Sequence, residues 1–143
     1  MKKKNSTAEF GKERNEFLIR AFRESIAAQS RISINNAFKQ AAEVPAPRFW
    51  VSEARAAVVL GKMAAGEDPT ESMFPEKRDM YREMFARFLE LREQYPDTSV
   101  NELVFRVVND EAPRSYLSWH RARVIIFSEM SRLKRERRKR WSE

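Results

Sequence analysis

The sequence contains no cysteine, one histidine and only three glycines among its 143 residues. Without cysteine the chain has no disulfide, no thiolate zinc site and no cysteine nucleophile. The lone histidine, His120, excludes a histidine-rich metal site, and three scattered glycines cannot build a glycine-rich phosphate-binding loop. We therefore expect a protein that is not an enzyme and that uses neither a cofactor nor a metal.

Long hydrophobic runs are also absent, since no apolar stretch approaches the roughly 20 residues that a membrane-spanning helix needs. The basic residues Lys2–Lys4 are not followed by the apolar segment of a secretory signal. Hydrophobic residues nevertheless make up 42% of the chain and include ten phenylalanines, which is enough to bury a core. We expect a soluble cytoplasmic protein without membrane association, made of one compact domain or two very small ones.

The net charge of +7 is concentrated at the two ends of the chain. Lys2–Lys4 carry +3 and residues 131–143 carry +5, so the body between them is close to neutral. Such a dense run is typical of segments that bind phosphate, although solubilising tails and helix ends also carry cations. The run predicts nucleic-acid contacts from these residues: Arg132, Lys134, Arg135, Arg137, Arg138, Lys139 and Arg140.

Two parts of the chain repeat each other at a constant spacing of 66 residues, without a gap. Residues 33–60 are identical to residues 99–126 at nine of 28 positions, whereas roughly two matches would arise by chance. Both copies contain Ala-Pro-Arg followed by an aromatic residue and a serine, at Ala46–Ser52 and Ala112–Ser118. Duplication of a common unit explains this register.

Each copy shows the pattern of three helices. Apolar spacing, cap residues and proline breaks predict helices at about 8–30, 34–43, 53–65, 76–94, 100–108 and from 119 to about 140. We therefore predict an all-α fold of two tandem tri-helical repeats with a long basic C-terminal helix. The first repeat with its basic amino terminus occupies 1–66, followed by a linker at 67–75, the second repeat at 76–130 and the basic tail at 131–143.

Two helices, a break and a third helix resemble the layout of the helix-turn-helix class of DNA-binding domains. The resemblance covers about residues 17–63 and 83–130, and it implies DNA binding by two neighbouring units. The break at 44–51 is longer than the three- to four-residue turn of the simplest members. Either this loop or the helix that follows it at 53–65 would make the contact.

Five arginines in and after the repeated loops are candidate contacts. Arg48 and Arg114 lie in the loops, where each could bind phosphate or a base edge, or instead form an internal salt bridge or bind a carbonyl. Arg55 and Arg121, early in the third helix of each copy, present the same alternatives. Arg123 has no cationic counterpart in the first copy, so the repeated core does not require it.

The remaining residues of the repeated motif have simpler interpretations. Trp50 and Tyr116 occupy matched positions, and matched aromatic residues are expected to pack in the core. Ser52 and Ser118 precede predicted helices, which favours a capping role, and helix amides beside them are able to receive a phosphate.

We expect a small nucleic-acid-binding protein that binds duplex DNA through two helix-turn-helix-like units and the basic tail, in a regulatory, phage or mobile-element setting. The alternative is a non-catalytic helical adaptor or assembly module, which would bind a protein partner or a second copy through the Met- and Phe-rich helix at 76–94. RNA binding is a third possibility, since the tail would suit RNA equally well.

Overall fold

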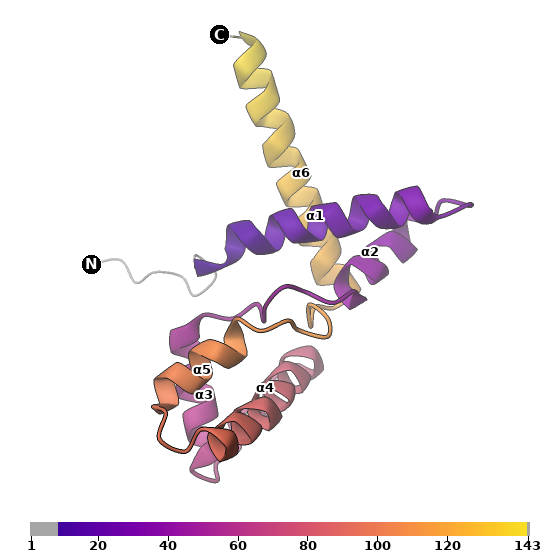
Figure 1. Cartoon of the computed structure of the whole chain (residues 1–143). Coiled ribbons are helices and arrows are strands. Elements are labelled where there is room, and N and C mark those ends of the chain that lie inside the picture. Colours follow the sequence, from indigo (N-terminus) through magenta and orange to yellow (C-terminus); the bar gives the residue numbers. More distant parts are fainter. Residues whose placement is uncertain (1–8, 143) are drawn as a thin grey trace.

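The computed structural model describes residues 9–142, and within them the chain forms six helices (Figure 1). They are α1 (Gly11–Ala28), α2 (Ile34–Glu43), α3 (Glu53–Ala64), α4 (Pro75–Gln94), α5 (Val100–Val108) and α6 (Trp119–Ser142). The described residues contain no strand beyond a single bridge between Ala46 and Ala112. The all-helical prediction is confirmed. None of the described helices has the length and apolarity that crossing a membrane would require.

Four serines set where helices begin. The hydroxyls of Ser33, Ser52, Ser99 and Ser118 each accept a hydrogen bond from the backbone N–H three residues later, at 3.1–3.3 Å. This bond satisfies one of the amides that a helix start leaves without a partner. The capping role predicted for Ser52 and Ser118 is confirmed, and the observed helix ends lie within three residues of the predicted ones.

The helices pack as two bundles, which exchange their third helices between the two sequence repeats. In the first bundle α6 packs against α1 and α2, and in the second bundle α3 packs against α4 and α5. Figure 1 shows the two groups joined by the loops that precede α3 and α6. We expected the three helices of each repeat to pack on one another. The contacts differ from that expectation, because each third helix lies on the first two helices of the other repeat.

The two loops cross at equivalent positions. The N–H of Ala46 donates to the carbonyl of Ala112 and the N–H of Ala112 donates to the carbonyl of Ala46, both at 2.9 Å. A second reciprocal pair joins Phe49 N–H to the Val108 carbonyl and Ser115 N–H to the Ala42 carbonyl, both at 3.0 Å. In each pair the donors and the acceptors are separated by 66 residues. The hydrogen bonds therefore relate the two loops by an approximate twofold axis between Ala46 and Ala112.

Proline explains why the third helices do not fold back on their own repeat. Pro47 and Pro113 follow the two alanines, and the residue before a proline is restricted to extended backbone. Ala46 and Ala112 are buried at the crossing, where their small side chains let the two backbones approach. The extended crossing carries each chain segment over to the other bundle before the next helix begins.

Trp50 lies in the loop that precedes α3 and contacts both α1 and the loop that precedes α6. Its ring packs against Phe10 and Phe17, with centroid separations of 6.3 and 5.9 Å, and its indole N–H donates to the hydroxyl of Ser115 at 3.0 Å. The predicted burial of Trp50 is confirmed. Its counterpart Tyr116 is only half-buried and adopts a φ of 55°, in the left-handed region that non-glycine residues rarely occupy.

Candidate functional site

Arg48 lies inside the protein rather than on its surface. Only 8% of the residue is exposed, its Nε donates to the carbonyl of Phe49 at 3.1 Å, and one terminal nitrogen donates to the carbonyl of Val51 at 2.7 Å. An ion pair with Glu9 at 3.8 Å completes its surroundings. The loop itself therefore occupies the Arg48 guanidinium, in agreement with the alternative interpretation of this residue as a carbonyl-binding group.

Arg114 stands at the equivalent position and has different partners. Its guanidinium bridges Glu43 of α2 at 3.5 Å and Asp79 of α4 at 3.4 Å, and it lies over the ring of Tyr116. The side chain is partly exposed. Arg114 thus links the two bundles through long ion pairs, and its charge is largely balanced by two carboxylates.

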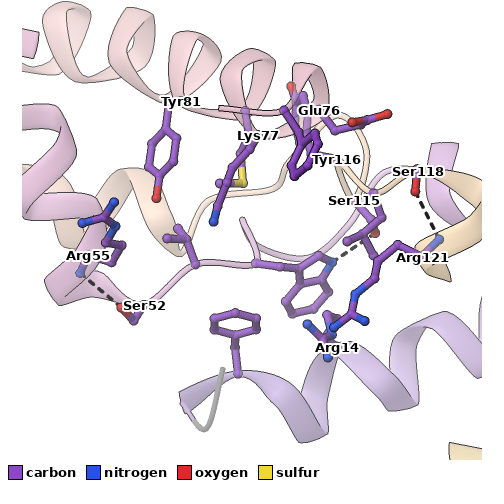
Figure 2. A pocket seen from close by; sticks show the side chains of 16 residues that line it. Arg14, Ser52, Arg55, Glu76, Lys77, Tyr81, Ser115, Tyr116, Ser118 and Arg121 are labelled. Atoms are coloured by element: carbon purple, nitrogen blue, oxygen red, sulfur yellow. Dashed lines mark hydrogen bonds between the residues drawn. The ribbon is translucent and has the colours of Figure 1, made fainter. Parts of the chain in front are cut away.

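Arg55 and Arg121 come together at one cavity of about 630 Å³, although 66 residues separate them. Figure 2 shows this space between the loop ahead of α3, the loop ahead of α6 and the first turns of α4. Its lining contains matched positions of both repeats, namely Trp50 with Tyr116, Val51 with Leu117, Ser52 with Ser118 and Arg55 with Arg121. The cavity therefore lies on the approximate twofold axis, and we call it the axial cavity.

Four cations line the axial cavity: Arg14, Arg55, Lys77 and Arg121. In Figure 2, Arg14 and Arg121 lie next to each other on one side, Arg55 lies opposite, and Lys77 extends from α4 between them. Across residues 9–142, none of the four has a carboxylate within 4.0 Å, although Glu76 also lines the cavity. Burial lowers the pKa of Arg14, and the positive charge of Arg121 lowers it further. With four cations and one carboxylate in its lining, the cavity has a net positive charge.

The hydroxyl of Tyr81 adds a polar group without a partner. Tyr81 is fully buried, lines the axial cavity, and makes no hydrogen bond of normal geometry with any described residue. Figure 2 shows its hydroxyl pointing away from α4 and toward the side of the cavity where Arg55 lies. Burial raises the pKa of the phenol, and the nearby Arg55 guanidinium opposes this rise. The hydroxyl is a neutral donor at physiological pH.

The second cationic surface is the outer part of α6, residues 131–142, which we call the C-terminal arm. Figure 1 shows the arm projecting past α1 and beyond both bundles. Six of its seven cations are exposed and form no ion pair with a described residue; they are Lys134, Arg135, Arg137, Arg138, Lys139 and Arg140. Trp141, near the end of the arm, is 89% exposed.

Arg132 differs from the other cations of the arm. It is held between Glu129 and Glu136, one turn before and one turn after it, and Glu129 also accepts a hydrogen bond from Asn15 of α1 at 3.4 Å. These carboxylates raise the pKa of Arg132, while Arg132 lowers the pKa of Glu129. The group attaches α6 to α1, so Arg132 is occupied structurally rather than presented to a ligand.

Of the two other features predicted to contact a partner, one is exposed and the other is buried. Arg123 is exposed on α6, with its guanidinium 5.4 Å from the ring centre of Phe127. In α4, by contrast, Met80, Met84 and Phe88 are buried in the second bundle. These three side chains therefore form core and do not offer an exposed apolar stripe.

Sequence reasoning missed three residues of the axial cavity, Arg14, Lys77 and Tyr81. Comparison of the two repeats does not single these residues out. The residue 66 positions after Arg14 is Met80, and the residue 66 positions before Tyr81 is Asn15. The residues that the structure describes contain no group of three histidine or acidic side chains suited to a metal ion. The axial cavity and the arm are the two places where cationic side chains gather without carboxylate partners among the described residues.

Comparisons of this chain with protein-family models, curated proteins and solved structures gave no match.

Proposed function

We propose that this protein binds nucleic acid, preferentially duplex DNA, and that the C-terminal arm supplies much of the affinity. The observation that carries the proposal is the placement of six exposed cations on a helix that projects from the body (Figure 1). Cations that only had to favour the end of a helix dipole would not require a projecting segment of this length. Neutralising phosphates releases bound counterions, which is the main source of non-specific affinity for DNA.

One face of the arm has the composition of a nucleic-acid contact. Lys134, Arg137, Arg138 and Trp141 follow a spacing of three, four and seven residues, which places them on the same side of a helix. Cations along that face are spaced to contact successive phosphates, and the exposed indole is able to pack on a sugar or stack on an unpaired base. Glu136, the acidic residue of the arm, is already bound by Arg132.

Duplex DNA suits the arm better than duplex RNA. The arm is a single helix of 12 residues, about 18 Å long at the usual rise. The major groove of B-form DNA admits an α-helix, whereas the major groove of A-form RNA is too narrow for side chains to read. The outer turns of the arm project beyond α1 (Figure 1), and a projecting helix is the shape that the DNA groove accommodates.

The body would add contacts from its two three-helix units. We propose that the tandem repeats present two related surfaces to neighbouring half-sites, as in the helix-turn-helix class, with Arg123 as an exposed contact beside the arm. The exchange of α3 and α6 fixes the two units relative to each other, so the spacing of the half-sites would be fixed by the fold.

The test is the salt dependence of binding to a fluorescent 20-base-pair duplex. In the full-length chain, Lys134, Arg137 and Arg138 are replaced together by Gln, which keeps the helix and leaves Arg132 and its carboxylates in place. If all three contact phosphate, the slope of log affinity against log salt should flatten by about 3. The same duplex, its single strand and an RNA hairpin of equal length are compared at one salt concentration.

The matched control removes the same charge elsewhere. Lys12, Arg31 and Lys62 are exposed and form no ion pair with a described residue, and their joint replacement by Gln should change the slope far less. Equal slopes for the arm variant and the wild type would refute the role of the arm. Tighter binding to the RNA hairpin than to the duplex would refute the preference for DNA.

A further inference from the structure

The axial cavity has a combination of features that the arm lacks, because it is enclosed on several sides and lies on the approximate twofold axis. Arg14 and Arg121 approach each other there without a carboxylate between them among the described residues. Arg14 is half-buried whereas Arg121 is exposed. The like charge of Arg121 disfavours the partly desolvated Arg14 guanidinium, and a bound anion would offset this cost. Packing in the protein does not require this arrangement, which indicates a ligand.

The start of α6 strengthens the preference for an anion. Ser118, which caps α6, lines the cavity beside Arg121, and Ser52, which caps α3, lines the opposite side beside Arg55. The amino-terminal ends of both helices therefore open on the same space. Helix starts carry partial positive charge and are common sites for phosphate.

Aromatic side chains line the rest of the cavity, so the ligand is more than an inorganic anion. Phe74, the residue ahead of α4, lines the cavity while 83% of it is exposed. Tyr116 lines it as well and is held at a φ of 55°, and such strained backbone is concentrated at ligand sites. The ring of Tyr116 is already packed against Phe49 and Arg114, so Phe74 provides the accessible ring. An exposed ring beside a cationic space suits a planar ring that is linked to a phosphate.

The third feature of the cavity, after its cations and its aromatic side chains, is the hydroxyl of Tyr81. A fully buried polar group normally has a hydrogen-bond partner. Within residues 9–142 this hydroxyl makes no hydrogen bond of normal geometry, although the Arg55 guanidinium lies close enough to lower its pKa. A sugar hydroxyl or a ring nitrogen in the cavity would accept its proton.

We propose that the axial cavity binds one nucleotide, with its phosphate at Arg14, Arg121 and the start of α6, its base at Phe74, and a polar atom at the Tyr81 hydroxyl. A volume of about 630 Å³ lies within the usual range for sites of small ligands. The nucleotide is either a free molecule or the phosphorylated end of a nucleic-acid strand, since both have the same chemistry. The site does not depend on the C-terminal arm.

The test is calorimetric titration of the full-length protein with adenosine and guanosine 5′-monophosphate, adenosine, and inorganic phosphate. We expect one molecule of at least one monophosphate to bind per chain, and adenosine and phosphate to bind at least about tenfold more weakly, because each makes only part of the contacts. Replacing Arg14 or Arg121 by Gln should weaken nucleotide binding about tenfold or more, since each removes a charge-assisted hydrogen bond. Tyr81→Phe should weaken it by less, about three- to tenfold.

The control is Arg20→Gln, which removes a cation from the same helix as Arg14 at an exposed position outside the cavity and should leave binding unchanged. Thermal unfolding of each variant identifies any loss of folding, and Tyr81→Phe retains the ring, so the site remains testable if an arginine variant unfolds. Nucleotide binding that persists unchanged in both arginine variants and in Tyr81→Phe would overturn the proposal.

A second titration separates the two sources of the nucleotide. A 12-nucleotide strand with a 5′-phosphate is compared with the same strand carrying a 5′-hydroxyl. Preference for the phosphorylated strand that is lost in Arg121→Gln, without binding of the free monophosphates, identifies a strand end as the ligand. Binding of neither monophosphates nor the phosphorylated end overturns the proposal. The variant with three Gln residues in the arm should still bind the nucleotide, so failure of DNA binding by the arm and failure of this site are distinguishable.

Discussion

At the scale of single residues, equivalent positions of the two repeats have diverged in role. Arg48 and Arg114 occupy the same place in the same motif, yet Arg48 binds two backbone carbonyls while Arg114 bridges two carboxylates. The motif alone left both interpretations open. The neighbours decide between them, and these come from other elements that the motif does not specify.

The energetic cost of losing each arginine should differ accordingly. Arg48→Met removes the donor to the buried Val51 carbonyl, so the free energy of unfolding should fall by about 2 kcal/mol. Arg114→Met breaks long, partly exposed ion pairs and should cost less than about 1 kcal/mol. Urea denaturation of the two variants beside the wild type measures both values. An equal loss in the two variants would contradict the structural difference between them.

At the scale of the helix, α6 has two parts with different surroundings. Ala122, Ile125 and Ile126 face the core of the first bundle, whereas the arm projects beyond it. The sequence predicted the bounds of this helix and of the other five well, because serine caps and proline breaks are local signals that do not depend on tertiary contacts. It did not predict that Arg132 is occupied, although Glu129 and Glu136 stand at the local spacings that form ion pairs on a helix. The contact of Glu129 with Asn15, from the other end of the chain, has no local signal.

This attachment predicts a dependence of stability on pH. Arg132 and Asn15 hold the pKa of Glu129 below its ordinary value, so the carboxylate stabilises the fold above the pKa of the unfolded chain and loses that effect as the pH falls through the folded pKa. The wild type should therefore lose stability faster below about pH 4.5 than Glu129→Gln, and the two should converge in acid.

Urea midpoints measured between pH 7 and pH 3 test this expectation. Glu24→Gln is the control, because Glu24 is an exposed carboxylate of α1 that forms no ion pair with a described residue. Its curve should run parallel to that of the wild type. A Glu129→Gln curve that also runs parallel to the wild type at all pH values would show that Glu129 does not attach α6 to α1 through its charge.

At the scale of the whole molecule, the exchange of third helices is the feature that sequence patterns could not give. Duplicated helices carry similar apolar faces, so α3 and α6 would each fit either pair of partners, and periodicity cannot distinguish the two packings. The axial cavity depends on this choice, because it brings Arg55 and Arg121 of different repeats together at the crossing loops. The sequence therefore predicted only some residues of the candidate site, and it did not predict that residues of both repeats meet there.

The exchange makes the two halves of the chain depend on each other for folding. Expressed separately, residues 1–66 and 67–143 each lack the third helix that completes their bundle. The third helix that each half does contain, α3 or α6, would have lost the two helices against which it packs. We expect each half to have lower helicity as a monomer than in the intact chain, because its helices of 9–24 residues lose part of the packing that supplies most helical stability. Mixing the halves should restore the circular dichroism spectrum of the intact chain at a 1:1 ratio.

Association of one half with itself would follow the same logic, since a second copy supplies an equivalent third helix. A half that folds cooperatively as a monomer, verified by sedimentation, would show that the third helix packs within its own repeat and that the crossing of Ala46 and Ala112 does not determine the fold.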